Sequence, residues 1–249
     1  MEIKSLPADF PDAVVVDLET TGLHVRSDRI IEIGALRLRG GRVTDTLSVL
    51  IDPGFPLTEH ITDLTGITPD MLRGKEKFAE CADRVLSFLG EDVLIGHRIT
   101  TDYAFLKKAF VDAYPKGFVF ERKGIDTLKL ARNFLPADEK KNLSAACSHY
   151  GLTFPPHRAM EDAKATLFLL EKLWEEFGEK SPLLFEPKPL RYAVKRDTPI
   201  MKKQIEQIER LISEKGIAMD FDPAGMTKSS ASRLIDQIRS GQYGNGGSS

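Results

Sequence analysis

The sequence predicts an α/β protein with a mixed, mostly five-stranded sheet flanked by helices, followed by a small C-terminal helical appendage. Residues 14–16 are three consecutive valines, which is typical of a buried strand. Segments 29–38 and 43–51 are apolar or alternating and are joined by Gly40-Gly41, which indicates an antiparallel hairpin. Beyond residue 76, helical and strand patterns alternate, so parallel strands are expected to extend the antiparallel part of the sheet.

Each later element has its own signal. Apolar residues at helical spacing predict helices over 76–89 and 159–177. One or two short helices are expected around 57–64 and 69–72, and another helix from about 101 to 113, after the turn at Gly96-His97. A buried strand is expected over 92–96 and a fifth strand near 124–125. Asp126 and Asn142 are of residue types that cap helices, so one helix should follow each, the second ending at Gly151.

The chain divides into four parts by composition. We expect one domain over residues 1–180, a Pro-rich basic linker over 181–198, a small helical module over 199–240 and a disordered tail over 241–249. Between residues 186 and 203, six basic and two acidic residues leave a local charge of +4. In the module, Thr198-Pro199 is expected to start a helix that stops at Gly216, and a second helix should cover 228–240.

Composition excludes several classes of protein. The 249 residues are 41% hydrophobic and 29% charged, with a formal net charge of −2. No apolar run approaches the roughly 20 residues that span a bilayer, and residues 1–5 lack signal-peptide character. We therefore expect a cytoplasmic protein without a membrane partner, and no disulfide between Cys81 and Cys147. The chain therefore lacks the overall positive charge that is typical of nucleic-acid-binding proteins. An enzyme that holds phosphate groups through bound metal ions does not need such a charge.

Three segments carry acidic residues at positions where sites form. Asp17 and Glu19 end the first strand on one side of it, where they repel each other unless a cation or a proton intervenes. Asp102 lies in the first turn of a helix after Gly96-His97, and Asp162 follows His157 at another helix start. Each of these residues could also be explained without a functional site. Acids at a strand end often face water, acids in a first helical turn are stabilised by the helix dipole, and a histidine in a loop is usually a surface residue.

The order and spacing of these segments resemble a known family. Residues 17–22 read D-x-E-T-T-G, residues 96–102 read G-H-x-x-x-x-D and residues 157–163 read H-x-A-x-x-D-A. Over roughly residues 13–173 the chain resembles the histidine subclass of DEDD exonucleases. This subclass includes the proofreading subunit of bacterial DNA polymerase III, ribonuclease T and oligoribonuclease. The resemblance implies a ribonuclease-H-like fold for the first 180 residues.

The resemblance also implies roles for single residues. Asp17, Glu19, Asp102 and Asp162 would hold two Mg²⁺ or Mn²⁺ ions, which suit oxygen ligands, and His157 would be the general base that activates water. The residues after Glu19 would contact the terminal nucleotide: Thr20, Thr21, Gly22 and Leu23. Thr65, Arg98 and Thr101 occupy positions where many relatives have His, Asn and Phe, so substrate preference is expected to differ. Arg98 would then either contact a phosphate or be a solvated helix-start residue.

The expected function is that of a metal-dependent 3′→5′ exonuclease that releases nucleoside 5′-monophosphates from single-stranded DNA or short RNA. The alternative is a catalytically idle nucleic-acid-binding or scaffold subunit of a replication or repair complex. Residues 181–240 would bind the strand, stabilise the first domain, or dock onto a polymerase or another replication or repair protein. Because 2′-OH sensing depends on the local shape of the groove, the motifs do not separate DNA from RNA.

Overall fold

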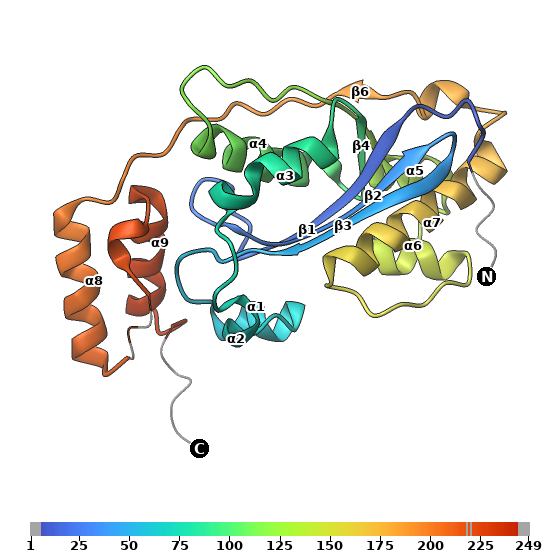
Figure 1. Ribbon diagram of the computed structural model, residues 1–249. Helices are drawn as coiled ribbons and strands as arrows, with labels where there is room; N and C mark the ends of the chain where they lie inside the picture. Colours follow the sequence, from blue (N-terminus) through green and yellow to red (C-terminus); the bar gives the residue numbers. More distant parts are fainter. Residues whose placement is uncertain (1–5, 218, 220, 244–249) are drawn as a thin grey trace.

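A six-stranded mixed sheet forms the centre of the molecule. The computed structural model describes residues 6–217, 219 and 221–243 (Figure 1). The strands are β1 (Ala13–Thr20), β2 (Ile30–Arg39), β3 (Arg42–Leu50), β4 (Val93–Gly96), β5 (Lys123–Asp126) and β6 (Lys188–Pro189). They lie in the order β3-β2-β1-β4-β5-β6. The first three are antiparallel neighbours, as predicted, whereas β4 pairs in parallel with both β1 and β5.

The sixth strand differs from the five that the sequence predicts. It comes from the expected linker, where Lys188 and Pro189 pair antiparallel with Gly124 and Lys123. Leu190 follows it and is buried among the side chains of the sheet and of the helices beside it. A Pro-containing strand of two residues fits only an edge, where a missing N–H donor does no harm. The segment is thus partly built into the sheet.

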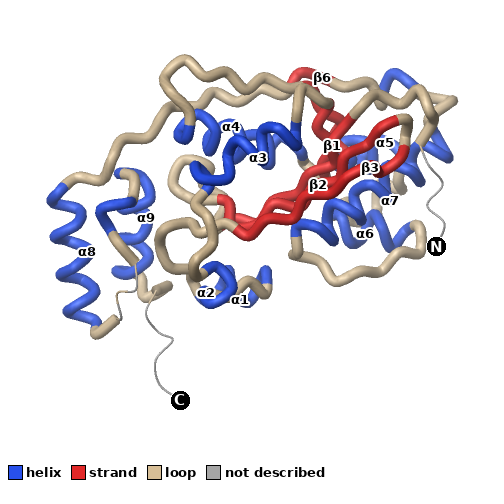
Figure 2. The backbone as a smooth tube through the Cα atoms, viewed as in Figure 1, coloured by secondary structure: helices blue, strands red, loops and turns tan. Residues whose placement is uncertain are grey.

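Helices cover both faces of the sheet, as Figures 1 and 2 show. Helices α3 (Phe78–Leu89) and α4 (Ile99–Ala113) pack on the side that receives Val14 and Val16. Helices α5 (Thr127–Phe134), α6 (Leu143–His149) and α7 (Ala159–Phe177) pack on the side that receives Val15. The alternation of the strand side chains therefore gives the domain two apolar layers, and both are closed by helices.

The predicted caps and short helices are mostly observed. Asp126 accepts a hydrogen bond from the backbone N–H of Leu128 at the start of α5, and Asn142 caps α6 in the same way. Helices α1 (Glu59–Thr65) and α2 (Pro69–Leu72) lie beyond β3.

Cys81 and Cys147 are buried free thiols, as expected. No helix in the described part of the chain has both the length and the apolarity to cross a membrane.

The C-terminal module is a helix pair with its own core. It contains α8 (Lys202–Lys215) and α9 (Lys228–Arg239), with one 3₁₀ turn (Pro223–Gly225) between them and another (Pro182–Leu184) earlier in the chain. The helix does end at Gly216, but the predicted start at Thr198-Pro199 is wrong. Pro199 instead forms a β-bridge with Thr227, and α8 begins at Lys202. Of the tail predicted over 241–249, residues 244–249 lie outside the described part of the chain.

Candidate active site

The first pair of acidic residues lies at the end of β1 in the middle of the sheet. Asp17 is opposite Gly34 of β2 and Glu19 is opposite Glu32, after which the register shifts at Thr20. Glu19 is only 8% exposed. The strand thus carries two carboxylates into a partly enclosed space, because its valines fix which side each residue faces.

Helix α4 adds the third acid. It begins directly after β4, the parallel neighbour of β1, so its first turn lies beside the end of β1. Burial raises the pKa of Asp17, and electrostatic repulsion from Asp102 raises it further, so the two carboxyl groups lie near each other. The topology therefore brings together two residues that are 85 positions apart in the sequence.

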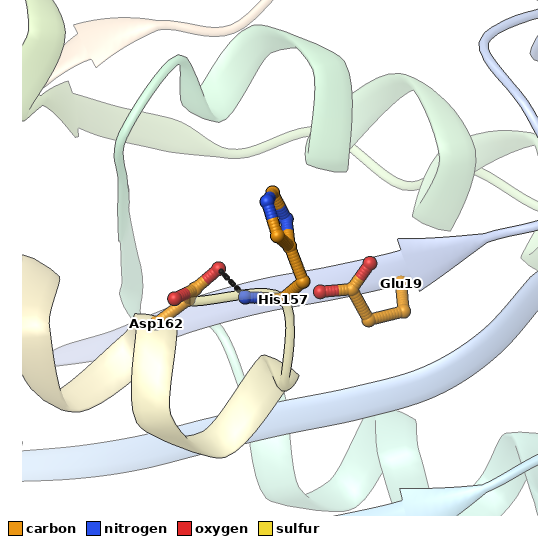
Figure 3. Close-up of side chains that lie close together, drawn as sticks. All are labelled: Glu19, His157 and Asp162. Carbon is orange, nitrogen blue, oxygen red and sulfur yellow. Dashed lines mark hydrogen bonds between the residues drawn. The ribbon is translucent and has the colours of Figure 1, made fainter. Parts of the chain in front are cut away.

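The third segment supplies Asp162 and His157. Candidate ligand atoms of Glu19, His157 and Asp162 lie within 4.8 Å of one another. The backbone N–H of His157 donates to Asp162 Oδ2 at 3.2 Å, while the imidazole extends away from that bond (Figure 3). Asp162 Oδ1 is buried and has no hydrogen-bond partner. An acceptor in that state is expected where a bound cation completes the site.

Two residues of the site have strained backbones. Among the described non-glycine residues, positive φ occurs at Arg98 (76°) and His157 (70°). Each residue lies just before a helix that carries an acid of the site. A side chain in this left-handed region costs about 1–2 kcal/mol, and such strain collects at functional positions. The strain at His157 turns the chain so that its side chain and Asp162 both face Glu19.

Glu32 is a site residue that the sequence analysis missed. Its side chain is 2% exposed and binds Arg158 through both carboxylate oxygens, with the shortest contact at 2.8 Å. It also accepts the backbone N–H of Ala159 at 3.0 Å, so it caps α7 from the neighbouring strand. The available signal was a single acid within the apolar run Ile30–Leu36, where a charge without a partner would be costly.

The close approach of α7 to β2 depends on a glycine. A Cβ at Gly34 would overlap the backbone of Ala159 and Met160. Because no side chain intervenes, the first turn of α7 rests directly on the strand that carries Glu32. Gly34 and Glu32 together therefore set how far Asp162 and His157 extend towards the acids of β1.

The carboxylates hold their protons more tightly than isolated acids do. Burial, followed by repulsion from Asp162 and Glu32, raises the pKa of Glu19 to about 8. Burial raises the pKa of Asp102 to about 7, and burial together with the surrounding acids raises that of Asp17 well above its usual value. The pKa of Asp162 is also raised, chiefly by burial. The four acids therefore repel one another unless positive charge is placed among them.

These residues fit divalent cations. The donor set consists of carboxylate oxygens with one histidine nearby, and both buried cysteines belong to the apolar layers. Oxygen-rich sites of this kind suit Mg²⁺ or Mn²⁺ rather than softer metals. The unpartnered Oδ1 of Asp162 supports the same conclusion.

The predicted nucleotide-contacting residues follow Glu19 directly. The Thr20 hydroxyl donates to the Gly22 carbonyl at 2.7 Å, and the buried Thr21 hydroxyl accepts the Arg29 backbone N–H at 2.9 Å. These two hydroxyl groups therefore make hydrogen bonds within the loop. Leu23 is 86% exposed.

The two remaining predicted contacts are placed differently. Thr65 is buried, donates to Ile61 O at 2.8 Å and accepts from the N–H of Ile67, so its hydrogen bonds stay within its own segment. Arg98 is exposed just before α4, and its backbone N–H donates to Asp126 Oδ1 at 3.0 Å. Arg98 thus lies beside the helix of Asp102, while the contacts of Thr65 do not link it to the acids.

His97 has a structural role that the motif alone does not reveal. Its ring nitrogens are 3.0 Å from Thr127 Oγ1 and 2.8 Å from Lys141 O. Burial lowers the pKa of His97, which favours a neutral ring that donates to Lys141 O and accepts from the Thr127 hydroxyl. It therefore links the end of β4 to the start of α5 and to the following loop.

Comparison with known proteins agrees with this geometry. The sequence model of the exonuclease family (RNase_T) matches residues 14–170. DNA polymerase III subunit epsilon of Aquifex aeolicus is 36% identical over 170 residues, which are 66% of this chain and 83% of that protein. The PolC-type DNA polymerase III of Clostridium perfringens is 36% identical over 168 residues, but these are only 11% of its length.

Solved structures show the same fold. Exonuclease X in complex with 5′ overhanging duplex DNA superimposes with a TM-score of 0.53 at 25% identity, covering 67% of this chain and 93% of that one. Escherichia coli exonuclease I in complex with a dT13 oligonucleotide gives a TM-score of 0.59 at 20% identity, covering 71% of this chain and 43% of that one. The fold is thus ribonuclease-H-like, and the matched residues include every acid of the site. The chain belongs to the exonuclease family.

Proposed function

We propose that this protein is a metal-dependent 3′→5′ exonuclease that removes nucleoside 5′-monophosphates from the 3′ end of single-stranded DNA. The observation that carries the proposal is the convergence of four carboxylates and His157 from three separate segments. Their raised pKa values show that the arrangement is costly to keep charged. A scaffold without turnover would have no need of this cost.

Asp17, Glu19, Asp102 and Asp162 would hold the cations. Two divalent ions bound there would stabilise the attacking and leaving oxygens of an in-line displacement at phosphorus. The four carboxylates would supply the negative charge that balances those ions. Glu32 and Arg158 keep the first turn of α7 in place, so Asp162 does not move away when the acids repel one another.

His157 acts as the general base. Its imidazole lies beside Glu19 and Asp162 (Figure 3), where it could accept a proton from a water molecule that attacks the terminal phosphodiester. The ring nitrogen accepts the proton of that water as the new P–O bond forms, and the 3′ oxygen of the preceding nucleotide leaves. Because His157 is exposed, it can pass the proton on to bulk solvent before the next cycle.

The loop after Glu19 binds the terminal nucleotide. It follows directly from the strand that carries Asp17 and Glu19, and its apolar Leu23 side chain is exposed. An apolar side chain of this kind can rest on a base of any sequence, as exonucleolytic digestion requires. Arg98, at the start of the Asp102 helix, is placed to contact a phosphate of the same strand. Thr65 remains a more distant candidate.

The names of the relatives support a setting in DNA replication or repair. The relatives include a DNA polymerase III subunit and a PolC-type DNA polymerase III, so we assign this protein to the cytoplasm, at the 3′ ends of DNA. A polymerase or another replication or repair protein would dock through residues 181–240, which lie beyond the family match at 14–170.

Matched DNA and RNA oligonucleotides test the substrate class. Purified full-length protein should shorten a 5′-labelled single-stranded DNA with Mg²⁺ or Mn²⁺ and do so faster than the RNA of the same sequence. Equal or faster digestion of RNA would contradict the DNA assignment. Binding of both without digestion would support the idle scaffold instead.

A further inference from the structure

We propose that the C-terminal helix pair is a positioning element that holds the substrate-binding loop, residues 21–29, through Arg29 and Arg233. The inference rests on the proposed function, because this loop begins two residues after Glu19 and contains Gly22 and Leu23. Figures 1 and 2 show the helix pair beside the end of the sheet to which the loop belongs. The contacts come from residues almost two hundred positions away in the sequence.

Arg29 makes the first polar connection between the loop and the helix pair. Its Nη2 atom donates to Thr227 Oγ1 at 2.6 Å and to Ser230 Oγ at 2.5 Å, at the start of α9. The same atom lies 3.8 Å from Oδ2 of Asp197, whose side chain is 4% exposed. The backbone of Arg29 in turn accepts from and donates to Thr21. Arg29, at the C-terminal end of the loop, is therefore hydrogen-bonded both to the start of α9 and to Thr21 at the N-terminal end of the loop.

Arg233 makes the second connection through Asp28. Its Nε atom is 3.6 Å from Asp28 Oδ1, and the Asp28 side chain is 1% exposed. Asp28 accepts the backbone N–H of His24 at 2.7 Å, and a Cβ at Gly22 would lie 2.5 Å from Asp28 Oδ2. The carboxylate therefore fills the inside of the turn that presents Leu23. A buried carboxylate of this kind needs a cation nearby, and α9 supplies it.

An apolar contact fixes the helix pair against the same domain. Phe55, from the segment after β3, is 7% exposed and packs in the core formed by α8 and α9. The outer part of the loop is also joined to α9, because Arg26 Nε lies 3.2 Å from Ser229 Oγ. The module thus has an apolar contact at Phe55 and polar contacts to Arg26, Asp28 and Arg29 of the loop, which is more than a simple connection would require.

A pair of arginine variants on one helix tests the proposal in the full-length protein. Arg233→Gln removes the cation beside Asp28, whereas Arg239→Gln removes an equal charge from the exposed end of α9. For Arg233→Gln, we expect KM for a single-stranded oligonucleotide to rise roughly five- to tenfold. Its kcat should change by less than about twofold, because the acids and His157 are untouched. Arg233→Lys should restore much of the loss.

Amide hydrogen exchange supplies a second readout without metal or substrate. Exchange in residues 21–29 should become faster in Arg233→Gln and stay unchanged in Arg239→Gln. The proposal is overturned if the two variants match in KM and in exchange, or if kcat falls while KM stays constant. If Arg233→Gln does not fold, Ser229→Ala must show faster exchange in the loop instead. An inactive wild-type protein would refute the proposed exonuclease but leave the exchange comparison valid.

Discussion

Asp17 lies among four other acidic residues of the site. Burial and the charges of Asp102, Asp162, Glu19 and Glu32 all raise its pKa. In the unfolded chain it would ionise near pH 4, so the metal-free folded state loses stability as the pH rises from there through the raised pKa. Positive charge from bound metal would remove this loss, which links binding to stability.

Replacing Asp17 by Asn is therefore expected to separate activity from stability. Turnover should fall to background, because one of four metal-binding carboxylates is lost. In the absence of metal, the variant should melt at a higher temperature than the wild type at pH 8, and this gain should shrink towards pH 4. Thermal unfolding in a chelator measures it. A large drop in melting temperature at pH 8 would show that Asp17 is structural.

His157 combines a chemical role with a strained backbone. His157→Ala should lower turnover on the order of 10²–10⁴-fold, as expected when a general base is removed. His157→Gly should lower turnover equally but be more stable than the alanine variant by up to about 1 kcal/mol, because glycine tolerates positive φ. Calorimetry with Mn²⁺ is the control, since much weaker binding in either variant would make His157 a metal ligand.

At the level of elements, the start of α7 depends on Glu32 of β2. Glu32→Gln weakens the two-oxygen contact with Arg158 and the cap on Ala159, so we expect the free energy of unfolding to fall by about 1–3 kcal/mol. Turnover should fall with it, because Asp162 and His157 are carried by the same turn. Chemical denaturation and initial rates measure the two effects.

A matched glutamate substitution on α7, the helix that Glu32 caps, provides the control. Glu161 pairs with Lys164 at 2.8 Å, but both side chains are about half exposed. Glu161→Gln should therefore change stability by less than about 0.5 kcal/mol. If the Glu32 and Glu161 variants behave alike in stability and rate, Glu32 does not position the site.

For the whole molecule, residues 181–198 are part of the exonuclease fold as well as a connection to the helix pair. Leu190 is 6% exposed beside β5, so Leu190→Ala should destabilise the protein by about 2–4 kcal/mol. Leu183 is 69% exposed, and Leu183→Ala should have almost no effect. Equal stability of the two variants in urea would mean that the segment is a free tether. Because of this packing, truncation after residue 180 would disturb the sheet itself.

Much of this architecture follows from local sequence patterns. The valines before Asp17, the Gly40-Gly41 hairpin and the caps at Asp126 and Asn142 each act over a few residues, so their elements are predictable. The two-residue strand at Lys188 is not, since its pairing is decided by β5. Thr198-Pro199 has the residue types of a helix start, but pairing with Thr227 takes precedence.

The site was predictable where residue types recur at fixed spacing, and less so where partners are distant. The four acids and His157 belong to short motifs. The role of Glu32, in contrast, depends on its contact with Arg158, which is 126 positions later in the sequence. The positive φ at Arg98 and His157 has no signal in residue type, since neither is glycine. In the same way, nothing in residues 21–29 reveals that α9 contacts them.

The central claim is that four carboxylates from three segments form one metal-dependent site that digests a strand from its 3′ end. The most direct test is product analysis with a 5′-labelled single-stranded DNA, comparing the wild type with Asp17→Asn at increasing Mn²⁺. The wild type should give a ladder that shortens one nucleotide at a time and should release 5′-monophosphates, only when metal is present. Asp17→Asn should give none. A ladder that persists in chelator, or in the variant, would contradict the account.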